Sequence, residues 1–190
     1  MGNGIAFVYA VSRRELLAVP GSARQEIIDT IAAEYWQLDN VAQSFEDDDL
    51  PIDLVGAVAQ IVRGEELHPD LGSLYLHAVE AICWYLGSTL VLPVGFCGEE
   101  RIDELLEARG CRLRVAQLVG FGSPLPIPEP GYPPEIGWWA PEAIAAGGPE
   151  ILSLSLEGVD RETAEGVAEV RSWLFEAMDL PDGCLVGTYY

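Results

Sequence analysis

The sequence predicts an α+β domain in which a small, mostly antiparallel sheet packs against several helices. The chain opens at residues 4–11 and closes at residues 184–190 with short segments rich in β-branched and aromatic residues, as in buried strands. Most of the chain between them has the apolar spacing of helices. Strands at both ends with helices between them are typical of an α+β domain, and we expect the first and last strands to be neighbours.

Length and composition predict a single domain over residues 1–190. Hydrophobic residues make up 49% of the chain and charged residues 22%, both close to the averages of globular proteins. A chain of this length buries roughly 70% of the surface that its unfolded form exposes. A sizeable core can therefore form.

Several helices are predicted from apolar stripes and capping residues. Ser12 and Glu15 have the spacing of a capping box, which predicts a short helix directly after Ser12. Residues 71–86 are apolar on most sides, so this helix should lie at the centre of the fold. The predicted helices cover residues 13–18, a segment after Ser22 with apolar residues at 27, 31, 35 and 38, residues 52–62, 71–86, 99–109, a short segment from Pro141, and residues 161–178.

Three further segments are predicted to be extended. Residues 112–119 and 151–156 alternate polar and apolar side chains, which favours half-buried strands. Residues 91–96 are predicted as a short strand or an extended loop.

Alternating prolines mark residues 120–134 as a strap that is neither helix nor central strand. The prolines stand at positions 124, 126, 128 and 130, and proline has no N–H to donate. Leu125 and Ile127 should point to one side, toward the body of the domain. The strap is either a structural connection or, with Trp138 and Trp139 after it, a recognition surface. Core filling is the competing interpretation of both tryptophans.

The charge of the chain is its only global indication of function. There are 31 Asp and Glu against 10 basic residues, all of them Arg, for a formal net charge of −21. Such a field repels nucleic acid and anionic membranes and attracts basic partners. No segment approaches the ~18–20 apolar residues of a membrane span, and the first residues have no signal-like pattern. We therefore expect a cytoplasmic protein that binds neither nucleic acid nor a membrane.

A run of four consecutive acids is the densest charge in the sequence. It is interpreted as a solvated loop tip or as a docking patch for a basic partner. A calcium loop fits less well, because the carboxylates do not alternate around a turn glycine. The run consists of Glu46, Asp47, Asp48 and Asp49.

No motif in the chain specifies a metal, a cofactor or a known reaction. The four cysteines, Cys83, Cys97, Cys111 and Cys184, form no Cys-x-x-Cys pair, so we expect buried thiols and no zinc site. Nucleophile-elbow, phosphate-loop and His-Glu-x-x-His motifs are absent. Acids at 99, 100, 103 and 104 suit the N-terminal end of their helix, and Asp103 and Glu107 are interpreted as a solvated helix face.

His77 and Glu80 are the best candidate polar pair, since they lie on one side of the central helix. They are interpreted as a core histidine satisfied by a carboxylate, or as a base and its partner near Tyr75. Cys83 lies roughly 120° around the helix from His77, a poor geometry for proton transfer. Metal binding by the pair would need ligands from elsewhere.

Four segments together resemble an uncharacterised bacterial domain family of about 190 residues, common in actinobacteria. They are GIAFVYAVS, LYLHAVEAIC, PLPIPEPGYPPEIGWW and LVGTYY, and the resemblance covers nearly the whole chain. The family is a domain of unknown function. The resemblance implies a soluble, stand-alone bacterial domain. It implies no catalytic residues.

The leading hypothesis is a non-enzymatic acidic binding protein, of the inhibitor, immunity or accessory type, that engages a basic protein or peptide. The alternative is an enzyme or small-ligand-binding domain with a site around Tyr75, His77 and Glu80. A self-associating structural protein is disfavoured by the net charge. No cofactor is expected, and the oligomeric state is not predicted. The candidate partner-binding residues are Glu46, Asp47, Asp48, Asp49, Trp138 and Trp139.

Overall fold

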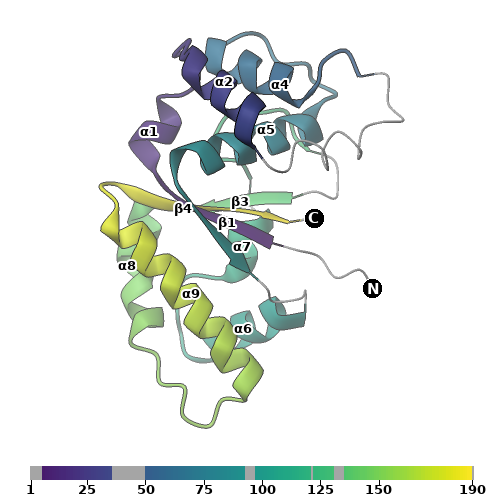
Figure 1. Ribbon diagram of the computed structural model, residues 1–190. Helices are drawn as coiled ribbons and strands as arrows, with labels where there is room; N and C mark the ends of the chain where they lie inside the picture. The colour runs from purple at the N-terminus through teal and green to yellow at the C-terminus, as the bar shows by residue number, and fades with distance from the viewer. Residues whose placement is uncertain (1–5, 36–49, 93–96, 121, 131–134, 190) are drawn as a thin grey trace.

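A four-stranded antiparallel sheet lies between two groups of helices in the computed structural model of the protein (Figure 1). The structure describes residues 6–35, 50–92, 97–120, 122–130 and 135–189. The strands are β1 (Ala6–Ser12), β2 (Ser88–Leu92), β3 (Glu135–Trp139) and β4 (Gly183–Tyr189), in the spatial order β2-β1-β4-β3. The predicted α+β class is therefore confirmed.

The first and last strands are neighbours, as predicted. β1 pairs with β4 along its whole length, with Tyr9 opposite Val186, and its other edge pairs with β2. β3 joins the far edge of β4. The first and last strands thus form the centre of the sheet.

The helices divide between the two faces of the sheet (Figure 1). On one face lie α1 (Arg13–Leu17), α2 (Gln25–Glu34), α4 (Leu54–Arg63) and α5 (Gly72–Leu86). On the other lie α6 (Cys97–Ala108), α7 (Val115–Gly120), α8 (Pro141–Leu152) and α9 (Arg161–Asp179).

Each face of the sheet has its own hydrophobic core because successive strand residues point to opposite sides. Tyr9 and Val11 of β1 belong to the core under α5, whereas Val8 and Ala10 belong to the core over α9. α5 is buried along most of its length, as its all-round apolar sequence predicts.

Two of the predicted strands are wrong. Residues 112–119 form a loop followed by helix α7, because the Asp103 carboxylate accepts the N–H groups of Val115 and Ala116 at the start of that helix. Residues 151–156 contain the end of α8 and a loop instead of a strand. Arg171 donates to the carbonyl groups of Ile151 and Leu154, which a strand ladder would have used. Tertiary contacts outweigh the alternating pattern in both segments.

The third predicted extended segment is partly confirmed. Strand β2 begins at Ser88, three residues before the predicted segment 91–96, and ends at Leu92. Residues 93–96 lie outside the described residues.

The proline-rich strap is extended where it is described, at residues 122–130, and it packs on the first core. Leu125 is buried and Ile127 is packed against the same core, as predicted. The strap also crosses the start of α5, since a Cβ atom on Gly72 would lie 2.2 Å from the Glu129 carbonyl oxygen. Only glycine allows this close approach.

Candidate functional site

The predicted pair on α5 forms a buried polar cluster with the sheet. The Glu80 side chain is fully buried, and its Oε1 accepts hydrogen bonds from the hydroxyl groups of Tyr9 (2.8 Å) and Thr188 (3.2 Å). Its Oε2 lies 3.7 Å from Nδ1 of His77. The cluster therefore joins α5 to both central strands, β1 and β4.

The hydroxyl group of Tyr75, the third residue of this predicted site, forms its hydrogen bonds away from His77 and Glu80. Its hydroxyl group donates to Oε1 of Gln60 and accepts the backbone N–H of His68 at 2.9 Å. Tyr75 therefore ties the start of α5 to α4. The structure brings His77 and Glu80 together and places the Tyr75 hydroxyl in a different network.

The tyrosine and cysteine side chains near Glu80 remain protonated. Burial and the nearby Glu80 carboxylate raise the pKa of Tyr9 and of Tyr35 well above the usual range. Burial likewise raises the pKa of the Cys83 thiol, so Cys83 is not an activated nucleophile. Hydrogen-bond donors thus surround the carboxylate, and this arrangement favours a structural role for Glu80.

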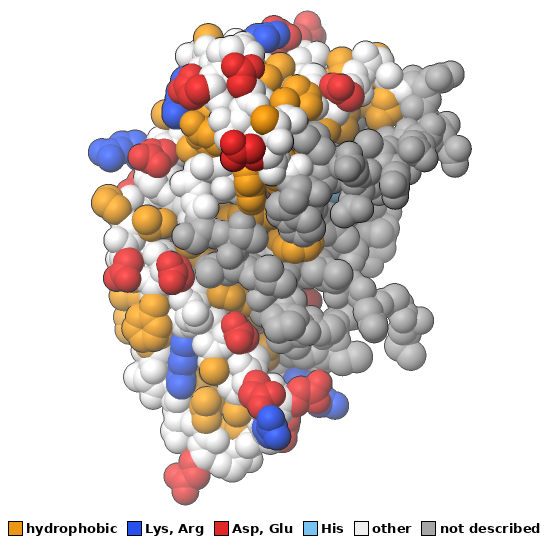
Figure 2. All heavy atoms as spheres, viewed as in Figure 1, with side chains coloured by type: hydrophobic (Ala, Val, Ile, Leu, Met, Phe, Trp, Pro, Cys, Tyr) orange, Lys and Arg blue, Asp and Glu red, His pale blue; other side chains and the backbone are white. Residues whose placement is uncertain are grey.

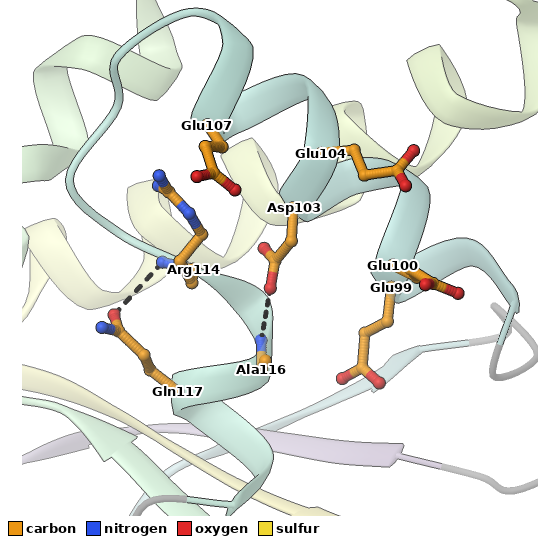
Figure 3. Close-up of a pocket in the computed structure, with 8 residues that line it drawn as sticks. All are labelled: Glu99, Glu100, Asp103, Glu104, Glu107, Arg114, Ala116 and Gln117. Atoms are coloured by element: carbon orange, nitrogen blue, oxygen red, sulfur yellow. Dashed lines mark hydrogen bonds between the residues drawn. The ribbon is translucent and has the colours of Figure 1, made fainter.

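A second set of ionisable side chains lines a groove of about 670 Å³ between α6 and α7 (Figure 3). Five of the eight lining residues are acidic, and one is basic. The lining residues are Glu99, Glu100, Asp103, Glu104, Glu107, Arg114, Ala116 and Gln117. We call this feature the acidic groove.

The spacing of acids on α6 builds one wall of the acidic groove. Glu99, Asp103 and Glu107 follow one another at intervals of four residues, so they share one face of the helix. Figure 3 shows all three directed toward α7 or the sheet, while Glu100 and Glu104 point away. Ile102 and Leu106, on the adjacent side of α6, are buried in the second core. Amphipathic packing therefore orients the acids.

Asp103 and two glycines hold the opposite wall in place. The Asp103 carboxylate accepts the N–H groups of Val115 at 2.6 Å and Ala116 at 2.9 Å. Behind α7, a Cβ atom on Gly137 would lie 2.3 Å from the Gln117 carbonyl oxygen, and one on Gly187 would lie 2.5 Å from the Leu118 carbonyl oxygen. The helix therefore sits directly on β3 and β4, with no side chain between them.

Arg114 balances only part of the charge in the acidic groove. Its Nη1 donates to the backbone carbonyl groups of Cys111 and Leu113, and its positive charge lowers the pKa of Asp103. Burial has the larger and opposite effect on Asp103, so the net shift of its pKa is upward. The positive charge of Arg114 thus offsets part of the negative charge near Asp103, while its Nη1 donates to backbone carbonyl groups.

Glu99 lies among other acids in the acidic groove. Its Oε1 is buried and has no hydrogen-bond partner among the residues that the structure describes. Burial, and then the charges of Asp103 and Glu135, raise its pKa to about 7. Near neutral pH Glu99 therefore exchanges between an acid and a carboxylate.

The predicted partner-binding residues occupy different environments. Trp139 is 2% exposed, and its indole N–H donates to the Arg114 carbonyl at 3.2 Å, so Trp139 supports the segment behind the acidic groove. Trp138 is half-buried and packs against the first core. Glu46, Asp47, Asp48 and Asp49 lie outside the described residues. A partner-binding role for all six residues stays a prediction.

The acidic groove was not predicted, because Asp103 and Glu107 were expected to lie on a solvated face of their helix. The regular spacing of Glu99, Asp103 and Glu107 was the available signal. It could not be read as one wall of a groove while residues 112–119, which form the other wall, were predicted as a strand.

The residues that the structure describes contain neither a candidate metal site nor a candidate membrane-spanning helix. Among them, no group of three or more His, Cys, Asp or Glu side chains is arranged to hold a metal ion. Within the same ranges, no helix is both long and apolar enough to cross a bilayer.

Comparison with known proteins places the chain in a family. The model of a domain of unknown function, DUF7691, matches residues 1–190, and the chain belongs to this family. The expected membership in a family of unknown function that spans the chain is thereby confirmed. No curated protein matches the chain, and no solved structure matches it. The family description names no activity, so function has to be inferred from the geometry of the site.

Proposed function

We propose that this DUF7691 protein is a non-enzymatic binding protein whose acidic groove engages a basic protein or peptide. One observation carries the proposal: five carboxylates line a single groove of about 670 Å³ whose one lining guanidinium group is bonded to backbone carbonyls. A basic side chain that enters the groove meets acceptors on α6. It also adds the positive charge that this region lacks.

The rest of the surface has a different charge pattern. Figure 2 shows Asp and Glu side chains spread over the visible face, so the net charge of −21 alone does not single out a docking patch. Several arginines are neutralised locally, such as Arg13 by Glu142 and Arg101 by Glu162. By contrast, none of the rim acids of the groove forms an ion pair with a described residue. These rim acids are Glu100, Glu104 and Glu107.

An inhibitor, immunity-type or accessory protein is the class that this arrangement supports, in a bacterial cytoplasm. The alternative, an enzyme or small-ligand site around Tyr75, His77 and Glu80, has less support. Tyr75 is engaged with Gln60 and His68, and Glu80 already accepts two hydrogen bonds from core side chains.

A labelled hexa-arginine peptide tests the proposal by fluorescence anisotropy at low and high salt. The groove variant is Glu100→Gln with Glu104→Gln and Glu107→Gln. The control variant is Glu34→Gln with Glu66→Gln and Glu176→Gln, which removes the same number of charges from exposed positions outside the groove lining. We expect the groove variant to bind at least about tenfold more weakly than the wild type, and the control within about threefold.

Equal weakening by the two triple variants would assign peptide binding to net charge and contradict a groove site. Failure of the wild-type protein to bind the peptide at low salt would contradict the proposed function itself.

The acid run at residues 46–49 offers a separate test of electrostatic docking. If Glu46, Asp47, Asp48 and Asp49 form part of the partner-binding surface, reversing their charges should slow association and flatten its dependence on salt. Stopped-flow mixing with the same peptide measures both quantities. Unchanged rates would remove the run from the docking surface.

A further inference from the structure

We propose that an exposed apolar surface on α8 and α9 is a second docking surface, which binds the apolar face of an amphipathic basic helix of the partner. The inference rests on the proposed function, because it specifies the structure of the basic partner. It adds an apolar contact on residues that do not line the acidic groove. We call this surface the apolar patch, and it consists of Phe175 and Met178 on α9 and Ala145 and Pro149 on α8.

The first observation is the exposure of two large hydrophobic side chains one turn apart on α9. Among the described residues, the exposed large hydrophobic side chains are Leu17, Phe175 and Met178, and the two on α9 are 58% and 50% exposed. Phe175 and Met178 are three residues apart, so they are neighbours on the surface of the helix. Other residues of α9, such as Val170 and Leu174, already fill the second core. Packing within the domain therefore does not account for the two exposed side chains.

The second observation is that α8 lies directly beside this part of α9. A Cβ atom on Gly148 would lie 3.5 Å from Cδ2 of Leu174, and Arg171 donates to the Ile151 carbonyl at 3.0 Å. Residue numbers thus rise along one helix as they fall along the other. The two helices therefore run side by side in opposite directions.

This alignment extends the apolar patch onto α8. Ala145, one turn before Gly148, lies beside the turn of α9 that carries Met178. Ala145 and Pro149 are both exposed, and their small side chains leave a flat surface on which a helix can pack. Figure 2 shows hydrophobic side chains on the visible face where Figure 1 places α8 and α9. Exposed apolar side chains that gather on one surface mark interaction sites.

The third observation is the charge beside the apolar patch, which selects a basic partner. Asp179 follows Phe175 by one turn, Glu176 is the next residue in the sequence, and both acids are exposed. The last turn of α9 contains no basic residue, although the C-terminal end of a helix favours one. Arg171 is on the same helix, but it donates to two backbone carbonyl groups at and after the end of α8. Cations from a partner would complement this end of α9.

The nearby arginine on α1 is already paired. Arg13 forms ion pairs with Glu142, at the start of α8, and with Asp182, in the turn after α9. By contrast, neither Glu176 nor Asp179 forms an ion pair with a described residue. These two acids are therefore the carboxylates that remain for a partner.

A basic partner fits the apolar patch better than a second copy of the chain. Two copies that met at this surface would bring the same acids together, and each copy has a net charge of −21. Four side chains also cover less than the roughly 800 Å² per partner of a stable interface, so the contact has to extend onto the acids. A helix with apolar residues on one face and Lys or Arg beside them complements both the apolar patch and its acidic border.

Fluorescence anisotropy with a labelled leucine–lysine peptide of about 14 residues tests the inference. The leucines of this peptide follow one face of a helix, whereas a comparison peptide of the same composition has them spread around the helix. We expect the wild type to bind the amphipathic peptide at least about tenfold more tightly than the comparison peptide. Phe175→Gln should weaken binding of the amphipathic peptide at least about fivefold, and Phe175→Gln with Met178→Gln should remove the preference.

Leu17→Gln is the matched control, because it replaces a similarly exposed hydrophobic side chain on α1, which packs on the other face of the sheet. We expect this control to bind the amphipathic peptide within about threefold of the wild type. Hexa-arginine has no apolar side chain, so its affinity should stay within about threefold in all of these variants. Urea denaturation verifies that each variant is folded.

The possible failures are distinguishable. The apolar patch is not a docking surface if the wild type binds both leucine–lysine peptides equally, or if Phe175→Gln and Leu17→Gln have equal effects. The proposed function still stands in these cases if hexa-arginine binds. If the wild type binds neither hexa-arginine nor the leucine–lysine peptides, both proposals fail. A dimer of the wild type that Phe175→Gln dissociates, measured by sedimentation velocity, would assign the apolar patch to a second copy and overturn the basic partner.

Discussion

Glu80 and Glu99 carry the same functional group on opposite sides of the sheet, and their surroundings differ in one respect. Glu80 projects from α5 into hydroxyl groups of β1 and β4, which donate to its Oε1. Glu99 projects from α6 toward other acids, and no described residue donates a hydrogen bond to its buried Oε1. The first carboxylate has hydrogen-bond donors within the fold, whereas Oε1 of the second has none among the described residues.

This difference predicts opposite contributions of the two carboxylates to stability. A buried carboxylate with its hydrogen bonds made contributes to the specificity of a core, and removing it leaves its donors unpaired. A buried carboxylate without donors destabilises the folded protein. Natural proteins tolerate such a cost mainly where function requires it.

The largest effect is expected from Glu80→Ala. This change leaves a cavity and strands the hydroxyl groups of Tyr9 and Thr188 in the core. We expect the free energy of unfolding to fall by about 2–5 kcal/mol, as measured by urea denaturation. A loss below about 0.5 kcal/mol, the usual range for surface sites, would show that Glu80 is not a structural anchor.

The pH dependence of stability should report Glu99. In the unfolded chain this group loses its proton above its ordinary pKa of 4.5, while the folded protein retains the proton up to about pH 7. The unfolded state is therefore favoured as the pH rises between these values, and the contribution of Glu99 to stability falls by at most about 3 kcal/mol. Urea denaturation across this range measures the loss.

Glu99→Gln is the control for this pH series, because it should remove the corresponding part of the decline. A variant that declines as steeply as the wild type would mean that Glu99 titrates at its ordinary value in the folded protein.

Two buried tyrosines near Glu80 provide a matched pair of smaller effects. Tyr9 donates to Glu80, so Tyr9→Phe should lower the free energy of unfolding by about 1–2 kcal/mol. Among the described residues the buried Tyr35 hydroxyl group has no hydrogen-bond partner, so Tyr35→Phe should change stability by less than about 0.5 kcal/mol. The ring of Tyr35 keeps its edge contact with Trp84 in the variant. Equal losses would contradict the assignment of donors around Glu80.

Apart from the near-neutral control Tyr35→Phe, the smallest of these stability effects is expected at the start of α7. Asp103→Ala removes the acceptor for the N–H groups of Val115 and Ala116, which should cost about 1 kcal/mol. Urea denaturation measures the change. Glu107→Ala on the same face of α6 serves as the control, because the carboxylate that accepts the N–H groups at the start of α7 is that of Asp103. A larger loss from Glu107→Ala would contradict the capping role of Asp103.

Much of the fold could be predicted because local sequence and final contacts agree. The β-branched segments at both chain ends become β1 and β4, and the apolar segment 71–86 becomes the buried helix α5. Ser12 accepts the Glu15 N–H as its capping position predicts. In each case the periodicity of the segment matches the surface that it buries.

The acidic groove could not be predicted because both of its walls depend on distant contacts. The segment at 112–119 alternates like a strand, but Asp103 from α6 caps it as a helix, and Gly137 and Gly187 leave room for that helix on the sheet. Single-sequence patterns do not contain these long-range contacts. The pairing of His77 and Glu80 was local to one helix, and it could therefore be anticipated.

The same substitution at both buried carboxylates tests the central comparison most directly. Glu80→Leu and Glu99→Leu each replace a carboxylate by an apolar side chain of similar size, and the free energy of unfolding is measured near pH 8. We predict a loss of at least about 2 kcal/mol for Glu80→Leu and an unchanged or higher stability for Glu99→Leu. Comparable losses at the two positions would contradict the account, because Glu99 would then be a structural group like Glu80.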